Sequence, residues 1–182
     1  MTFKTFTPTS RSPNKLAATM VILGIDPGIT HMGLGVIDWN KNSGQFLAGE
    51  MVQTEAKQPA TARVALIYQA ISRLIETYHP SAASIEGQYF YRQNELAFKV
   101  GWAVGAVAVA LAQAGIELYA YGPMQVKKAL VGTGRADKEQ VAFMVGKFLG
   151  LRDLPTSDHT TDALALALTH AFQPSFAHSR LV

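Results

Sequence analysis

The chain has 182 residues, 48% of them hydrophobic, enough to bury the core of one domain but not of two. Its formal net charge of +3 and isoelectric point near 9.2 allow a polyanionic partner without identifying one. The absence of cysteine excludes disulfide frameworks, thiolate zinc sites and cysteine nucleophiles, and it fits a cytoplasmic setting. No stretch is long and apolar enough to predict a membrane span.

The composition divides the chain into three segments. Residues 1–19 are rich in Thr, Ser, Pro and Lys and lack the apolar stretch of a signal peptide, so we expect a flexible N-terminal arm there. Residues 20–172 carry the periodic apolar patterns of a folded domain. Residues 173–182 carry no such pattern and are expected to form a flexible C-terminal tail.

Three β-like runs open the domain, at Val21–Asp26, Gly33–Asp38 and Gln45–Gln53. Turn-forming residues separate them, Pro27-Gly28 after the first run and residues 40–44 after the second. Because both links are short, we expect an antiparallel meander.

The rest of the domain alternates between helical patterns and short buried strands. The first helix follows Pro59 and presents a single apolar stripe. The remaining predicted elements are a strand at Ala82–Glu86, a helix at Asn94–Ala114, a strand at Ile116–Tyr121 and helices at Met124–Leu130, Asp137–Leu149 and Asp158–Ala171. This order predicts a three-layer α/β domain, with a five-stranded mixed sheet and helices on both faces.

Two carboxylates stand at the ends of predicted buried strands. Asp26 closes an apolar run just before a tight turn, and Glu86 closes its own short strand in the same way. Taken alone, each is also compatible with a simpler role, as a turn-capping Asp or a solvated Glu.

A further acidic group opens the last helix, in the run Asp158-His159-Thr160-Thr161-Asp162. Residues three or four apart share a helix face, so Asp162 aligns with either His159 or Asp158. Asp158 suits a helix N-cap, whereas Asp162 lies a turn inside an almost wholly apolar helix, where a carboxylate needs a partner or a metal. Together with the two strand-end acids, these residues predict a site for hard cations, two of which can clamp a phosphodiester.

Four spaced motifs resemble the RuvC family of bacterial Holliday junction resolvases, in the family's order from about Met20 to Phe172. They are Gly24-Ile25-Asp26-Pro27-Gly28, Ser84-Ile85-Glu86, Gln125-Val126-Lys127 with Val131-Gly132-Thr133-Gly134 and Lys138, and Asp162-Ala163-Leu164-Ala165 with Thr169-His170. The resemblance implies a ribonuclease-H-like fold, a homodimer and Mg²⁺ dependence. It also implies symmetrical nicking of two strands of like polarity in four-way junction DNA, during DNA recombination and repair.

The resemblance also assigns the active site. The family's catalytic and metal-binding acids fall on Asp26, Glu86 and Asp162. The fourth acid of many members falls on His159 here, so we expect His159 to complete the set, with Asp158 as the alternative. The expected cofactor is Mg²⁺, with two ions per active site, and Mn²⁺ is expected to substitute for it or to be preferred.

Basic and aromatic residues near these motifs are candidates for DNA contact. The run Tyr89-Phe90-Tyr91-Arg92 can form a base-stacking platform, and the family's stacking aromatic aligns with Tyr89. Lys127 and Lys138 match family positions that approach phosphates, and Arg135 lies between them in a glycine-rich loop, so the three are expected to clamp the DNA backbone. Taken singly, each charge is also compatible with simple solvation, and the aromatics with core packing.

The helix Asn94–Ala114 is apolar nearly all round and rich in Gly and Ala, so more than one of its faces must be covered. It is either a central core helix or, as the resemblance implies, the packing surface of a homodimer. Two other functions are compatible with the motifs, a ribonuclease-H-like nuclease of the YqgF type and a junction-binding protein without catalysis. The sequence leaves open whether a branch-migration helicase complex docks on the chain.

Overall fold

The computed structural model describes residues 20–41, 43–87, 95–155 and 157–172, so the predicted arm at 1–19 and the tail at 173–182 lie outside it. The described residues form five strands and five helices, and every predicted element is present with bounds shifted by a few residues. In chain order they are β1 Met20–Asp26, β2 His31–Asn40, β3 Ser43–Gln53, α1 Ala60–Tyr78, β4 Ala82–Glu86, α2 Glu95–Gln113, β5 Glu117–Tyr121, α3 Pro123–Val131, α4 Lys138–Leu149 and α5 Asp158–Phe172.

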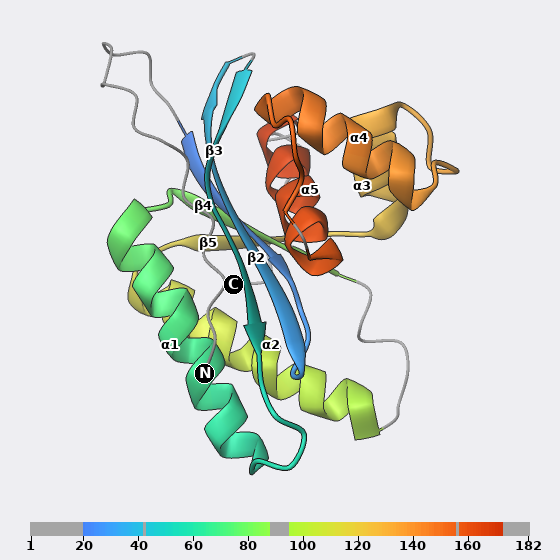
Figure 1. Cartoon of the computed structure of the whole chain (residues 1–182). Coiled ribbons are helices and arrows are strands. Elements are labelled where there is room, and N and C mark those ends of the chain that lie inside the picture. The colour runs from blue at the N-terminus through green and yellow to red at the C-terminus, as the bar shows by residue number, and fades with distance from the viewer. Residues whose placement is uncertain (1–19, 42, 88–94, 156, 173–182) are drawn as a thin grey trace.

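The strands make one mixed sheet in the order β3-β2-β1-β4-β5 (Figure 1). The first three strands pair antiparallel, as the short links predict, whereas β4 and β5 pair parallel to β1 and to each other. The β2–β3 hairpin is tighter than expected, because the strands stay paired out to Asn40 and Ser43. Lys41, in the turn, has a positive φ of 45°.

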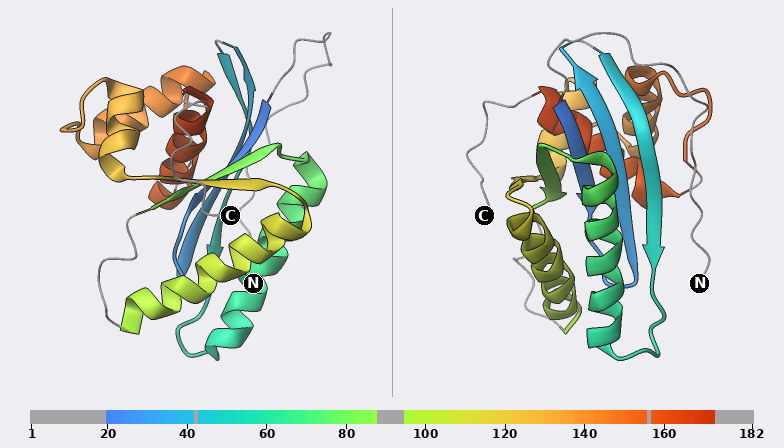
Figure 2. Two further views of the ribbon diagram at one scale, coloured as in Figure 1. Left: turned by 180° about the vertical axis from the view of Figure 1, so that it is seen from behind. Right: turned by 90° about the vertical axis from the view of Figure 1, so that its left-hand side faces the viewer.

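Helices cover both faces of the sheet and separate two hydrophobic cores, which confirms the three-layer architecture (Figures 1 and 2). On one face α1 and α2 pack over a core that includes Ile67, Ile71 and Leu74 of the predicted α1 stripe. On the other face α5 lies against β1 and β2, and α3 and α4 pack outside it. None of the helices in the described ranges is long and apolar enough to cross a membrane.

Glycines bring the backbone of α5 directly onto the sheet. A Cβ atom added at Gly24 of β1 would lie 1.9 Å from the carbonyl oxygen of Ala163, and one at Gly33 of β2 would lie 1.9 Å from that of His159. Any side chain at these positions would push the helix away from the strands. This close approach fixes the first turns of α5 beside the end of β1, where Asp26 lies.

Candidate active site

Asp26 and Glu86 lie at the same edge of the sheet. Asp26 is the last residue of β1 and Glu86 the last of β4, and these strands pair in parallel with Ile25 opposite Ile85. Because parallel strands finish at a common edge, the two carboxylates are carried to the same side of the molecule. Asp26 is only 8% exposed, while Glu86 is half-buried.

The start of α5 adds two more predicted residues to this edge. The Nδ1 atom of His159 lies 2.7 Å from Oδ2 of Asp26, within hydrogen-bonding distance. Asp162, one turn further along, faces the same hollow as the two strand-end acids. Three acids and one histidine therefore come together from β1, β4 and α5, three elements that are far apart in sequence.

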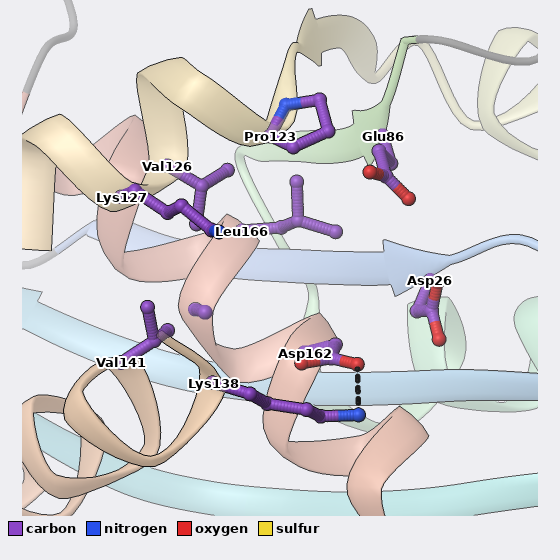
Figure 3. A pocket seen from close by; sticks show the side chains of 10 residues that line it. Asp26, Glu86, Pro123, Val126, Lys127, Lys138, Val141, Asp162 and Leu166 are labelled. Carbon is purple, nitrogen blue, oxygen red and sulfur yellow. Dashed lines mark ion pairs between the residues drawn. The ribbon is translucent and has the colours of Figure 1, made fainter. Parts of the chain in front are cut away.

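A hollow of about 280 Å³ opens between these acids and the helices α3, α4 and α5 (Figure 3). The three carboxylates border it together with Lys127 and Lys138. Its other lining residues are apolar or carry no charge: Pro123, Val126, Val141, Ala165 and Leu166. His159 does not line the hollow and reaches the site through its contact with Asp26.

Lys138, the first residue of α4, bridges two of the acids. Its Nζ atom lies 3.2 Å from Oδ2 of Asp162 (Figure 3). It also lies 3.2 Å from Oδ2 of Asp158. Burial acts to lower the pKa of Lys138, but the two carboxylates outweigh it and raise the pKa above its usual value. The start of α4 is held by Asp137, whose side chain accepts a hydrogen bond from the backbone of Gln140, so the position of Lys138 is well defined.

Burial raises the pKa of Asp26 above its usual value, and the nearby negative charge of Asp162 adds to the effect. The hydrogen bond and charge of His159 and the charge of Lys138 act in the opposite direction. A buried carboxylate beside a second one favours any cation that can approach both. The electrostatics of the site therefore suit positive charge, whether from a side chain, a metal ion or both.

The donor set suits a hard divalent cation, because carboxylate oxygens are the ligands that Mg²⁺ and Mn²⁺ prefer. Among the described residues, however, no three acidic or histidine side chains stand close enough to share one ion as they are placed. Lys138 holds Asp162, and His159 holds Asp26. The side chains of Lys138 and His159 that make these two contacts are each about half exposed, while Asp162 belongs to helix α5 and Asp26 to strand β1.

A family model of crossover junction endodeoxyribonuclease RuvC matches residues 22–170 of the chain. A RuvC from Thermus thermophilus is 53% identical over 156 residues, which cover 84% of this chain and 94% of that relative. The chain belongs to the RuvC family.

Solved structures agree with this assignment. The structure of T. thermophilus RuvC in complex with a Holliday junction substrate superposes with a TM-score of 0.83 at 51% identity, covering 88% of this chain and 98% of that one. The yeast mitochondrial Holliday junction resolvase Ydc2 has a TM-score of 0.58 at 14% identity over 88% of this chain and 83% of its own, which shows a shared fold only. The ribonuclease-H-like fold expected from the resemblance is confirmed. The alternative of a YqgF-type protein is wrong.

The predicted DNA-contact residues of this RuvC-family chain fall into three groups. Lys127 and Lys138 border the hollow. Arg135 is exposed in the loop between α3 and α4 and does not line the hollow. Tyr89 and Arg92 lie outside the described residues.

The two candidates for the fourth position behave differently. His159 is bonded to Asp26, whereas Asp158 is exposed and paired with Lys138. The expectation that Asp158 caps the helix is wrong, because α5 begins at Asp158 and the carbonyl of Ser157 accepts the backbone N–H of Thr161. Ser157 therefore occupies the cap position, and Asp158 belongs to the first turn, where its charge still favours the helix dipole.

The sequence interpretation missed three features around the site. The motifs include Gly24 alone of the glycines under α5, although Gly33 and Gly35 alternate along a strand toward one face, a signal for a closely packed helix. The ring of His31 stacks parallel to that of His159, with centroids 5.7 Å apart. Arg63 is buried on α1 without being part of its apolar stripe, so hydrophobic periodicity gave no reason to single it out.

Proposed function

We propose that this chain resolves Holliday junctions in DNA recombination and repair, by nicking two strands of like polarity symmetrically. The carrying observation is that acids from β1, β4 and α5 meet in one hollow beside Lys127 and Lys138, on a RuvC-family fold. The T. thermophilus relative, 51% identical, has been solved with a Holliday junction substrate, and this supports the same substrate here.

Asp26, Glu86, His159 and Asp162 are the residues that would hold Mg²⁺, with Mn²⁺ as a substitute. In such sites a pair of divalent ions supplies activation of the attacking water and neutralisation of charge at the leaving oxygen. Asp26, which is almost fully buried, and Glu86 lie at the ends of paired strands, so neither can shift without disturbing the sheet. Asp162 and His159 are held in place because the backbone of α5 packs directly on the glycines of β1 and β2.

Lys127 and Lys138 supply positive charge to the DNA phosphates. Lys138 is paired with Asp158 and Asp162, and an approaching phosphate can exchange for either carboxylate on the ammonium group. Each lysine that contacts a phosphate contributes about 0.9 to the slope of log affinity against log salt. Tyr89, Arg92 and Arg135 remain predicted DNA contacts beyond the hollow.

The second active site that paired nicking needs comes from a second copy of the chain. Along α2 an exposed stripe follows a spacing of four and three residues, which is the pattern of a helix-packing seam. Phe98 is 64% exposed and Trp102 is 42% exposed, and their rings touch edge to face. The members of the stripe are Phe98, Trp102, Gly105, Val109 and Ala112. Over the roughly 21 Å from first to last, the stripe carries no charge and suits the same stripe of a partner.

The function is tested by cleavage of a synthetic four-way junction against a linear duplex of the same sequence, with Mg²⁺ and the nicked strands mapped. We expect paired nicks in strands of like polarity in the junction and none in the duplex. Junction binding without any nicking would instead support the non-catalytic alternative.

The fourth ligand is tested separately with His159→Ala and Asp158→Asn. We expect His159→Ala to be nearly inactive, because His159 alone of the two contacts Asp26. Asp158→Asn should keep most of the activity, since it only removes one partner of Lys138. The reverse pattern in single-turnover rates would make Asp158 the ligand.

A further inference from the structure

We infer that Arg63 is a positioning residue for the active site, which sets the orientation of Asp26 through the turn between β1 and β2. The inference rests on the proposed function, because it concerns how that site is held. Arg63 lies in the first turn of α1, on the opposite face of the sheet from the hollow. It therefore does not line the hollow where the reaction is proposed to take place.

Arg63 is a buried arginine whose partners are neutral. It is only 6% exposed, and it donates from Nε to Oγ1 of Thr54 at 2.8 Å and from Nη2 to Oγ1 of Thr30 at 2.7 Å. Within the described part of the chain it takes part in no ion pair. The other arginine of α1, Arg73, forms an ion pair with the buried Glu50. Its Nη2 atom lies 2.7 and 2.6 Å from the two carboxylate oxygens. Burying the guanidinium charge of Arg63 with only hydroxyl groups as partners costs free energy of folding, and this points to a role beyond packing.

The two threonines tie Arg63 to the chain just beyond Asp26. Thr54 donates from Oγ1 to the carbonyl of Ile29 at 2.6 Å and from its backbone N–H to the carbonyl of Thr30 at 2.9 Å. Within the same turn, a Cβ at Gly28 would lie 2.1 Å from the carbonyl oxygen of His31. Arg63 thus closes a turn that is already tightly folded and clamps it to α1.

The clamped turn joins Asp26 to His31, and each of these two residues contacts His159. It begins directly after Asp26 and ends at His31, whose ring stacks on that of His159 with an interplanar angle of 3°. His159 in turn contacts Asp26 at 2.7 Å. Asp26, the turn, His31 and His159 therefore form a closed ring of covalent links and contacts. Arg63 holds this ring from outside the active site, through its hydrogen bond to Thr30 in the turn. If the turn relaxes, both partners of the Asp26–His159 contact are free to shift.

The experiment uses the full-length protein and variants at both ends of the clamp. Arg63→Met keeps the volume and removes the hydrogen bonds, and Arg63→Lys keeps the charge but loses the planar fork. Thr30→Val is nearly isosteric and removes one acceptor, so it stays informative if Arg63→Met fails to fold. The matched control is Arg73→Met, ten residues and roughly 15 Å along the same helix, which breaks a buried ion pair away from the turn.

The first readout needs neither metal nor DNA. We expect the imidazole ¹⁵N resonances of His159 to shift in Arg63→Met and Thr30→Val, while those of the buried His170 stay in place. The second readout is Mn²⁺ affinity of the DNA-free protein by electron paramagnetic resonance, where we expect about tenfold weaker binding in the two variants. Arg63→Lys should be intermediate. Arg73→Met should lower only the unfolding midpoint.

Folded Arg63→Met and Thr30→Val proteins with unchanged His159 resonances would overturn the inference, whatever their catalytic rates. Equal changes in Arg73→Met would do so as well, because they would reduce Arg63 to general stability. Failure of the proposed function looks different, since wild type would then cut no junction at any Mn²⁺ concentration while the His159 resonances still report on the clamp.

Discussion

Helices α2 and α5 are both built largely from small and apolar residues, yet the protein uses them in opposite ways. In α5 every residue from Ala163 to Ala171 is buried, between the sheet on one side and α3 and α4 on the other. Helix α2 is the more hydrophobic of the two in sequence, but it covers only part of its surface in the described structure: it packs mainly on α1 and β5 and leaves Phe98 and Trp102 exposed.

The hydrophobicity of a helix therefore does not show whether its apolar surface is buried within its own domain or left exposed for a partner. Helix α5 carries two residues of the proposed active site, and the glycines of β1 and β2 fix its position by letting its backbone approach the sheet closely. Helix α2 carries no predicted catalytic residue in its described part. Its apolar stripe is available for a second copy of the chain, which is the proposed homodimer.

The strongest loss of activity is expected at the N-terminal end of α5, where Asp162 lies in the proposed active site. Asp162→Asn keeps the shape of the side chain and removes its charge, and we expect the cleavage rate to fall by roughly a thousandfold, about 4 kcal/mol of transition-state stabilisation. Junction affinity should change little, because it comes mainly from phosphate contacts. Single-turnover nicking and junction binding are measured beside Asp153→Asn, an exposed acid outside the hollow. Near wild-type cleavage by Asp162→Asn would remove Asp162 from the site.

The second prediction compares how tightly the two helices are packed, by replacing one glycine with alanine at each. Gly24→Ala places a methyl group against the backbone of α5 and should destabilise the protein by about 3 kcal/mol. Gly101→Ala on α2 meets no atom within 4 Å and should stabilise it by up to about 1 kcal/mol, through helix propensity. Urea unfolding of both variants checks the opposite signs. Two destabilising results of equal size would show that α2 is as tightly covered as α5.

The exposed stripe of α2 is tested by charge. Trp102→Glu should weaken self-association by about 2 kcal/mol or more, because a buried aromatic anchor is replaced by a carboxylate in an apolar seam. The molecular mass in sedimentation should fall to that of a monomer, with an unchanged circular dichroism spectrum. Phe143→Glu is the control, because Phe143 is an even more exposed aromatic residue, on α4, far from the stripe in sequence and fold. If only Phe143→Glu lost the dimer, the interface would lie on α4 and not on α2.

The order of elements and the positions of the acids could be predicted because they depend on local patterns. Runs of apolar residues ending in Asp26 or Glu86 mark strand ends, and a carboxylate inside the apolar α5 is conspicuous in sequence. What could not be predicted depends on contacts between distant segments. The ion pairs of Lys138, the hydroxyl partners of Arg63 and the meeting of Gly33 with the backbone of His159 each join residues that no local periodicity connects.

The weakest effect, a change of stability with pH, is expected at the C-terminal end of α5. There His170 is buried, and its Nδ1 atom lies 2.8 Å from the hydroxyl of Tyr121. Burial lowers the pKa of His170 below its usual value, although Glu117 acts in the opposite direction. The same burial raises the pKa of Tyr121 to about 12, so the tyrosine remains a neutral donor. The folded state therefore holds His170 uncharged at a pH where the unfolded chain already binds a proton.

Stability should consequently be complete above the unfolded pKa of about 6.5 and should fall as the pH drops below it, by at most about 1.4 kcal/mol per pH unit for one proton. His170→Gln can still accept a hydrogen bond from Tyr121 but does not titrate. The difference in urea unfolding free energy between wild type and His170→Gln should thus shrink or reverse from pH 8 to pH 5. Because the comparison is made at each pH, the raised pKa of Asp26 cancels out. His79→Asn, at the exposed C-terminal cap of α1, is the matched control for removing a histidine elsewhere in the protein. A His170→Gln curve that is parallel to wild type would mean that His170 takes up its proton equally in both states and that α5 is open to water at this end.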